Sequence, residues 1–272
     1  MTNLTMVWLV AAATARRRRM SLLAFAAAAA GFHGLVAASF PAIGGMAAVE
    51  SVVTTFPAGL RTLLRLAPGL QAGFGLRDYL AFSWFHPVFL GLGTALVVAR
   101  AADALAGEIA SGAIYLLLSR PIPRWAFVVG KVLEMGWSAA IFCLAAWLGL
   151  ALGVWIGSLP TLTLGRFVPA ATIAWLLFLA LGTAALVISS LSSRAAAAAG
   201  LATALALILF VLDVIPALFN SPAALFNPWH HYFPQVIVAT GRVALPDVVV
   251  LVGWIVVGTI GAATFFARRD LV

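Results

Sequence analysis

Six long apolar stretches constrain this chain more than any other feature of its sequence. A helix needs roughly 20 apolar residues to cross the hydrocarbon core of a bilayer, where it satisfies its own backbone polar groups. With 64% hydrophobic and 9% charged residues, the 272-residue chain lies far outside the soluble range. We therefore predict an all-α, polytopic membrane protein with a single transmembrane domain, residues 1–272. The predicted spans cover residues 20–40, 82–100, 132–157, 167–191, 195–215 and 247–267.

Basic residues collect at alternate ends of these stretches. Arg16 to Arg19 precede the first stretch, Arg194 lies between the fourth and fifth, and Arg268 and Arg269 follow the sixth. Arginine and lysine are enriched on the cytoplasmic side of membrane proteins, so both termini and the loop 101–124 are predicted to be cytoplasmic. The net charge of +8 is thus a topology signal. It does not indicate nucleic-acid binding, which needs a basic soluble surface.

The first stretch allows a second interpretation. Four arginines, an apolar run and the small residues at 36–39 also form the pattern of a cleaved signal peptide. The run is long enough to span, however, and Trp8, Leu9 and Val10 suit a lead-in helix at the interface. These features favour an uncleaved membrane anchor.

Two segments on the predicted outer side are too long to be simple turns. The first, residues 41–81, is predicted to be interfacial, because its part 56–66 places leucines on one helical face and two arginines on another. The second, residues 216–246, contains five prolines and reads as broken, re-entrant or interfacial structure. The two arginines of the part 56–66 are Arg61 and Arg65.

The sequence contains no recognisable catalytic constellation. Lys131 is its only lysine, and Val132 follows where a P-loop needs serine or threonine. Its single cysteine, Cys143, excludes an internal disulfide and a cysteine-based metal site. We predict no catalytic residue, no metal ligand and no cofactor bound by this chain.

A few polar residues fall within or beside the apolar stretches. His33 either lines a pathway or makes an interhelical hydrogen bond. Glu134 follows Lys131 by three residues, so the two are predicted to pair on one helix face. Asp213 either bonds backbone groups freed by a following proline or borders a substrate exit. The adjacent pair His230-His231 is interpreted as outer-interface polar residues, since neighbours on a helix point about 100° apart and make poor joint metal ligands.

Three glycines repeat at four-residue spacing in the third stretch: Gly149, Gly153 and Gly157. Such a stripe lets a neighbouring helix approach closely. It predicts tight helix packing and does not identify a function.

The polar segment 101–124 carries the most specific pattern. Read as one helix, residues 101–118 place Glu108, Ser111 and Tyr115 on one exposed face, and two prolines then stop the helix. The order Asp103-x-Leu-Ala-Gly-Glu108-Ile-Ala-Ser-Gly112-x-x-Tyr-Leu-Leu-Leu-Ser-Arg120-Pro121-Ile-Pro-Arg124, followed by Gly130-Lys131, resembles the conserved stretch of ABC type-2 transporter permeases. The chain departs from that pattern at Ala113, where threonine is usual, and at Pro123, where serine is usual.

The resemblance implies a permease subunit of an ABC exporter, in the cell inner or plasma membrane, that is not itself an enzyme. Segment 101–124 would contain a cytoplasmic coupling helix docked on a separate P-loop ATPase, which binds ATP and Mg. A second permease copy would complete a homodimer or a heterodimer. By motif position, the residues implied to contact the ATPase are Glu108, Ser111, Gly112 and Tyr115; a purely structural role for them is the alternative.

Two other classes of function remain open. An intramembrane enzyme acting on lipids would need a polar cluster at one membrane depth, and the scattered His33, His86, Glu134 and Asp213 do not supply one in the sequence. A membrane assembly factor that works without an ATPase is the second. Co-purification of a P-loop ATPase with the chain would distinguish the transporter from the enzyme and from the assembly factor.

Overall fold

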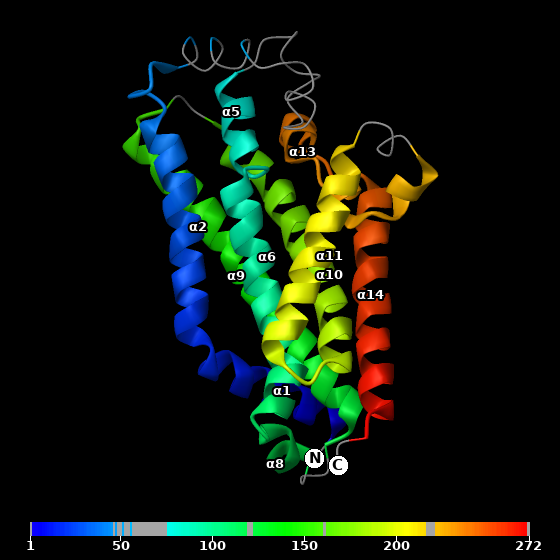
Figure 1. The fold of residues 1–272 in the computed structure, drawn as a ribbon. Helices are drawn as coiled ribbons and strands as arrows, with labels where there is room; N and C mark the ends of the chain where they lie inside the picture. Colours follow the sequence, from blue (N-terminus) through cyan, green and yellow to red (C-terminus); the bar gives the residue numbers. More distant parts are fainter. Residues whose placement is uncertain are drawn as a thin grey trace.

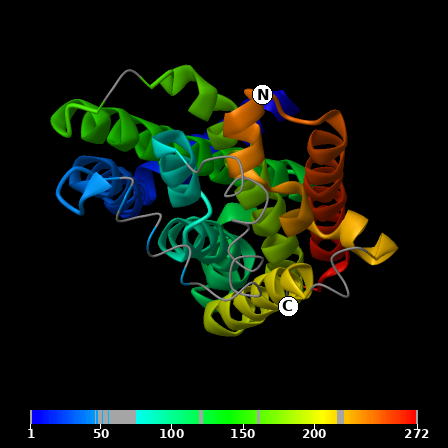
Figure 2. The same cartoon turned by 90° about the horizontal axis from the view of Figure 1, so that it is seen from above.

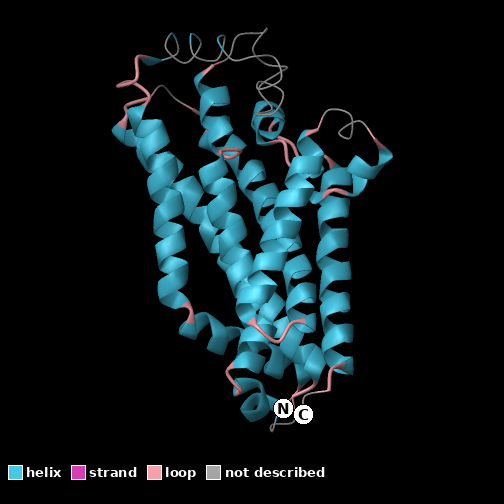
Figure 3. Ribbon diagram, viewed as in Figure 1, coloured by secondary structure: helices cyan, strands magenta, loops and turns pink. Residues whose placement is uncertain are grey.

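A computed structural model of the chain describes residues 2–45, 47, 51, 55, 75–118, 122–159, 162–215 and 221–270. Within these ranges every regular element is a helix, as Figure 3 shows. Six helices of the described part are long and apolar enough to cross a membrane. The prediction of an all-α chain with six potential spans is therefore confirmed.

The six spans form one bundle (Figure 1). The third begins at Arg124, earlier than the predicted residue 132, and the second is a composite of several elements. The spans are α2 (Arg19–Ser39); α5 (Leu76–Ser83) with α6 (Pro87–Ala102), the π-helix η2 (Asp103–Gly107) and α7 (Glu108–Ala110); α9 (Arg124–Ile156); the 3₁₀-helix η3 (Leu164–Phe167) with α10 (Val168–Leu191); α11 (Ala195–Val214); and α14 (Leu245–Arg268).

Shorter helices cover the two ends of the bundle. The end that carries both termini, here called the terminal end, also carries α1 (Asn3–Arg17) and α8 (Ala113–Leu118) (Figure 1). The opposite, distal end carries α5 and α13 (Pro234–Thr240), with the 3₁₀-helices η4 (Pro222–Phe226) and η5 (Pro228–His231). The amphipathic helix predicted over residues 56–66 lies outside the described residues.

The glycine stripe of α9 packs directly on α2. A Cβ atom added at Gly153 would meet the carbonyl oxygen of Gly34 and lie 2.8 Å from Cβ of Ala37. One added at Gly149 would meet the backbone of Ala30. The close helix approach predicted from the stripe is therefore confirmed, because no side chain fits between the two backbones.

The second span is interrupted between α5 and α6. Pro87 has no backbone N–H to donate, and its ring opposes a continuous helix. His86 caps the new helix, its Nδ1 accepting from the N–H of Val88 at 3.2 Å. The backbone carbonyl of Trp84, which lies in the break, accepts a hydrogen bond from the hydroxyl of Tyr232 at 2.7 Å. This bond from the segment at the distal end stabilises the break.

Helix α10 lies at the centre of the bundle. It packs against α6, α9, α11 and α14. Seen from above in Figure 2, α2 and α14 stand on opposite sides of the molecule. A displacement of α10 would therefore reach most of the bundle.

Candidate coupling site

The segment that follows the second span is not one continuous helix. Helix α6 widens into the π-helix η2, α7 follows for three residues, and the chain turns at Ser111 and Gly112 before α8 begins. Gly112 has a φ of +73°, the left-handed conformation that ends many helices and that glycine adopts without strain. The single helix predicted over residues 101–118 is therefore wrong: the glycine read as part of the helical pattern makes a corner.

The π-helix is fixed by a side chain of α10. The hydroxyl of Ser189 accepts from the N–H of Ala106 at 3.0 Å and donates to the carbonyl of Ala102 at 3.1 Å. A π-turn displaces the regular backbone ladder, and the buried Ser189 pairs two backbone groups there. Segment 102–106 is thus tied to the central helix.

Glu108 lies inside the protein, with 3% of its surface exposed. Its Oε1 accepts from Nζ of Lys131 at 3.1 Å and forms an ion pair with Arg17 of α1. The prediction that Glu108 shares an exposed face with Ser111 and Tyr115 is wrong in this respect. The partner Arg17 stands 91 residues away, so no local pattern could have named it.

Glu134 also pairs across helices. It forms an ion pair with Arg100 of α6, and both side chains are almost fully buried. The hydroxyl of Ser138 donates to Oε1 of Glu134 at 3.0 Å. The predicted Lys131–Glu134 pair is wrong, because each of these two α9 side chains pairs with the second-span segment instead.

These charges form one group, the ion-pair cluster. A fourth ion pair joins Arg18 to Asp103 at 2.5 Å, near the protein surface. Buried charges are tolerated when they are paired and hydrogen-bonded, and the cluster satisfies that condition by linking α1, the second-span segment and α9. Its members are Arg17, Arg18, Arg100, Asp103, Glu108, Lys131 and Glu134.

The corner beyond the cluster is the exposed part of the site. Ser111 is exposed, Gly112 is half-buried, and Tyr115 leaves 49% of its surface accessible, whereas Ile114 beside it is fully buried. Three of the four residues implied by the motif therefore lie together at the surface of the terminal end, and Glu108 lies beneath them. Their contact with an ATPase stays a prediction.

Two arginines tie the helix ends around this site together. The Nη1 of Arg124, the first residue of α9, donates to the carbonyls of Phe266, Ala267 and Arg269 at 2.7 to 3.0 Å. Arg269 in turn donates to the carbonyls of Ser190 and Ser192 at 2.8 Å. Cations at helix C-termini satisfy the last carbonyls and oppose the helix dipole. Arg269, which the sequence marks as a topology signal, and Arg124 therefore together fasten α9, α14 and α10 at one end.

The histidine pair at the distal end is held by two carboxylates. Nδ1 of His230 lies 3.0 Å from Asp213 of α11, and Nδ1 of His231 lies 2.8 Å from Asp247 of α14. The described residues contain no group of three or more potential ligands that could hold a metal ion. The proline that was expected to free backbone groups for Asp213, Pro216, lies outside the described residues.

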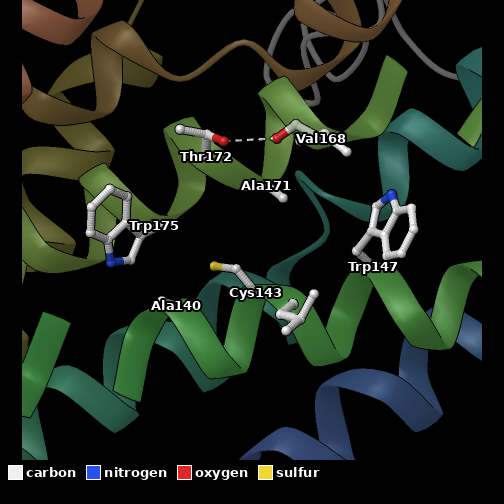
Figure 4. Close-up of a pocket in the computed structure, with 8 residues that line it drawn as sticks. Ala140, Cys143, Trp147, Val168, Ala171, Thr172 and Trp175 are labelled. Carbon is white, nitrogen blue, oxygen red and sulfur yellow. Dashed lines mark hydrogen bonds between the residues drawn. The ribbon is translucent and has the colours of Figure 1, made fainter. Parts of the chain in front are cut away.

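An open pocket of about 270 Å³ lies between α9 and α10 (Figure 4). Cys143 lies in its wall, between Trp147 and Trp175. The two indole N–H groups donate to backbone carbonyls at 3.1 and 2.8 Å, and the Thr172 hydroxyl donates to the carbonyl of Val168 at 3.0 Å. The pocket therefore offers mainly an apolar surface, not a set of free polar groups for chemistry.

Comparison with known families agrees with the motif and the helical layout. The family described as ABC-2 family transporter protein matches residues 13–271. No curated protein matches the chain. Members of this family are membrane subunits for transport, which is consistent with six potential spans and with a chain that is not itself an enzyme. By this match over nearly its whole length, the chain belongs to the ABC-2 transporter family.

Proposed function

We propose that this chain is the permease subunit of an ATP-binding cassette exporter, and that a separate P-loop ATPase docks on the corner at Ser111, Gly112 and Tyr115. The terminal end faces the cytoplasm of a cell inner or plasma membrane. The observation that carries the proposal is the exposed corner standing directly on the ion-pair cluster. Membership of the ABC-2 family and the basic residues of the terminal end support it.

The ion pairs of Glu108 and the hydrogen bonds of Ser189 would transmit a displacement of the corner to the membrane spans. Glu108 connects the corner to α1 through Arg17 and to α9 through Lys131. Ser189 connects the adjoining π-helix to α10. Closure of the ATPase around ATP and Mg would displace the corner, and because packed interiors transmit strain, these helices would move with it.

We assign the four motif residues two roles, which their burial supports. Ser111, Gly112 and Tyr115 would contact the ATPase, and the buried Glu108 would be a positioning residue that holds the corner on the bundle. A second copy of a permease, identical or related, completes the pathway. Substitution Glu108→Arg is a poor test of docking, because a buried reversed charge would disturb the fold itself.

The test is co-purification from a mild detergent with a tagged chain. We expect a P-loop ATPase to accompany the wild-type chain. Ser111→Arg should lower its recovery about tenfold, equivalent to about 1.4 kcal/mol of binding energy. The matched control is Thr163→Arg, which places the same charge at an exposed position of the distal end.

The outcomes separate the partner from its docking site. Repeated recovery of the permease alone under gentle conditions would refute the transporter proposal. Equal loss of the ATPase in the Ser111 and Thr163 variants would refute the placement of the contact at the corner.

A further inference from the structure

Two buried ring nitrogens near the α5–α6 break have no hydrogen-bond partner within the described residues. They are Nε2 of His33, on α2, and Nε1 of Trp84, in the break itself. Both side chains have 0% of their surface exposed. A buried polar atom without a partner is costly, and native proteins rarely contain one unless something else binds there.

The hydrogen bond of His33 and the chemistry of the indole determine which ring nitrogen donates and which accepts. Nδ1 of His33 lies 3.0 Å from the carbonyl oxygen of Ala29, and a carbonyl only accepts, so Nδ1 carries the proton. In the neutral ring Nε2 is then a pure acceptor. Nε1 of Trp84 is a pure donor.

The two rings are neighbours. Their centroids are 4.8 Å apart, and Phe89 packs on both, at 4.9 Å from His33 and 5.2 Å from Trp84. Non-helical backbone at membrane depth is tolerated where it is buried in protein or lines a hydrated cavity. The break that carries Trp84 is such backbone.

We propose that a single O–H group binds between His33 and Trp84, accepting from the indole N–H and donating to the imidazole Nε2. A carbonyl could satisfy only the indole, and an ammonium group only the imidazole, whereas a hydroxyl satisfies both. With two hydrogen bonds of about 2.9 Å, one oxygen bridges nitrogens up to about 6 Å apart. The hydroxyl belongs to a buried water or to an alcohol group of a solute in the bundle. The site is independent of any ATPase partner.

The first test is the thermal midpoint, Tm, of the full chain in mild detergent. If a hydroxyl is bound, His33→Leu removes one of its partners and lowers Tm by a few degrees. If none is bound, the same change removes an unsatisfied buried atom and leaves Tm unchanged or raised.

Combining His33→Leu with Trp84→Phe separates polar coupling from packing. A bound hydroxyl makes the second change less costly once the first is present. The matched control combines Phe89→Leu with Trp84→Phe, because Phe89 touches the same ring but has no nitrogen. Additive effects in the His33 pair, or coupling no larger than in the Phe89 pair, would overturn the proposal.

The second test identifies the source of the hydroxyl from the ¹⁵N indole signal of Trp84, assigned by its loss in Trp84→Phe. A change of this signal in His33→Leu in buffer alone that is clearly larger than the change in Phe89→Leu, which also removes a ring packed on Trp84, indicates water. A dependence on His33 that emerges only with 1-butanol, and not with butyl methyl ether, which cannot donate, indicates a solute hydroxyl. A signal that responds to His33→Leu no more than to Phe89→Leu in every condition would overturn the proposal.

Discussion

The substitution Glu108→Gln removes one charge from a buried ion pair and keeps the length of the side chain. Lys131, with 4% of its surface exposed, would then lose its carboxylate partner. Over 3.1 Å, with an effective dielectric constant of 20, the attraction is about 5 kcal/mol. Removing one member of a buried pair typically costs about 3–5 kcal/mol. Because glutamine still accepts a hydrogen bond, we expect a loss near 3 kcal/mol.

Thermal unfolding of the purified chain in detergent, followed by tryptophan fluorescence, measures this loss. At about 2–4 °C per kcal/mol, Tm should fall by about 6–12 °C. The matched control is Asp103→Asn in the same cluster. Its pair with Arg18 leaves 33% and 29% of the two side chains exposed, so the change should cost at most about 1 kcal/mol.

A double variant tests the physical reason. Glu108→Gln with Lys131→Met removes both charges and should recover most of the lost stability, because no buried charge is left alone. Equal falls in Tm for Glu108→Gln and Asp103→Asn would refute the reasoning. So would a double variant as unstable as the single one. An unchanged Tm combined with lost ATPase recovery would mean that Glu108 faces the partner and not Lys131.

Two further predictions concern helix contacts. Gly149→Ala should destabilise the chain by about 1–3 kcal/mol in the same Tm assay, because its Cβ would meet the backbone of Ala30. The control Gly200→Ala, which has open space around it, should be neutral or stabilising. Equal changes in Tm for the two variants would contradict this packing. Ser189→Ala should cost about 1–3 kcal/mol and speed amide exchange at Ala106, because it removes one hydrogen bond from each of two buried backbone groups. Ser190→Ala, which loses a bond only to Val187 of its own helix, should cost less, and the reverse order would argue against the role of Ser189.

The sequence by itself determined the features that depend on local composition. Helix number followed from the apolar stretches, because a bilayer demands a fixed length of apolar helix. The spacing of Gly149, Gly153 and Gly157 predicts that a neighbouring helix approaches α9 closely, because an absent side chain permits this whatever the partner; that the partner is α2 comes from the structure. The prediction that Ser111 and Tyr115 lie at the surface is confirmed, whereas the predicted continuity of their helix and the exposure of Glu108 on the same face are wrong.

Partner choice was decided by the tertiary structure. Lys131 and Glu134 are three residues apart, yet each pairs with a charge on another helix. The sequence predicts that His33 either lines a pathway or bonds across helices, whereas its Nδ1 bonds to the carbonyl oxygen of Ala29 in its own helix. His230 and His231 pair with carboxylates of two different spans.

The physical reason is common to the ion pairs. Hydrophobicity and side-chain size act on any neighbour, so the sequence alone predicts their effects. A buried charge needs one particular oppositely charged atom within about 3 Å, and in these pairs that atom is brought there by the packing of other helices. Thus Glu108, which local periodicity placed at the surface, is drawn inward by Arg17 and Lys131.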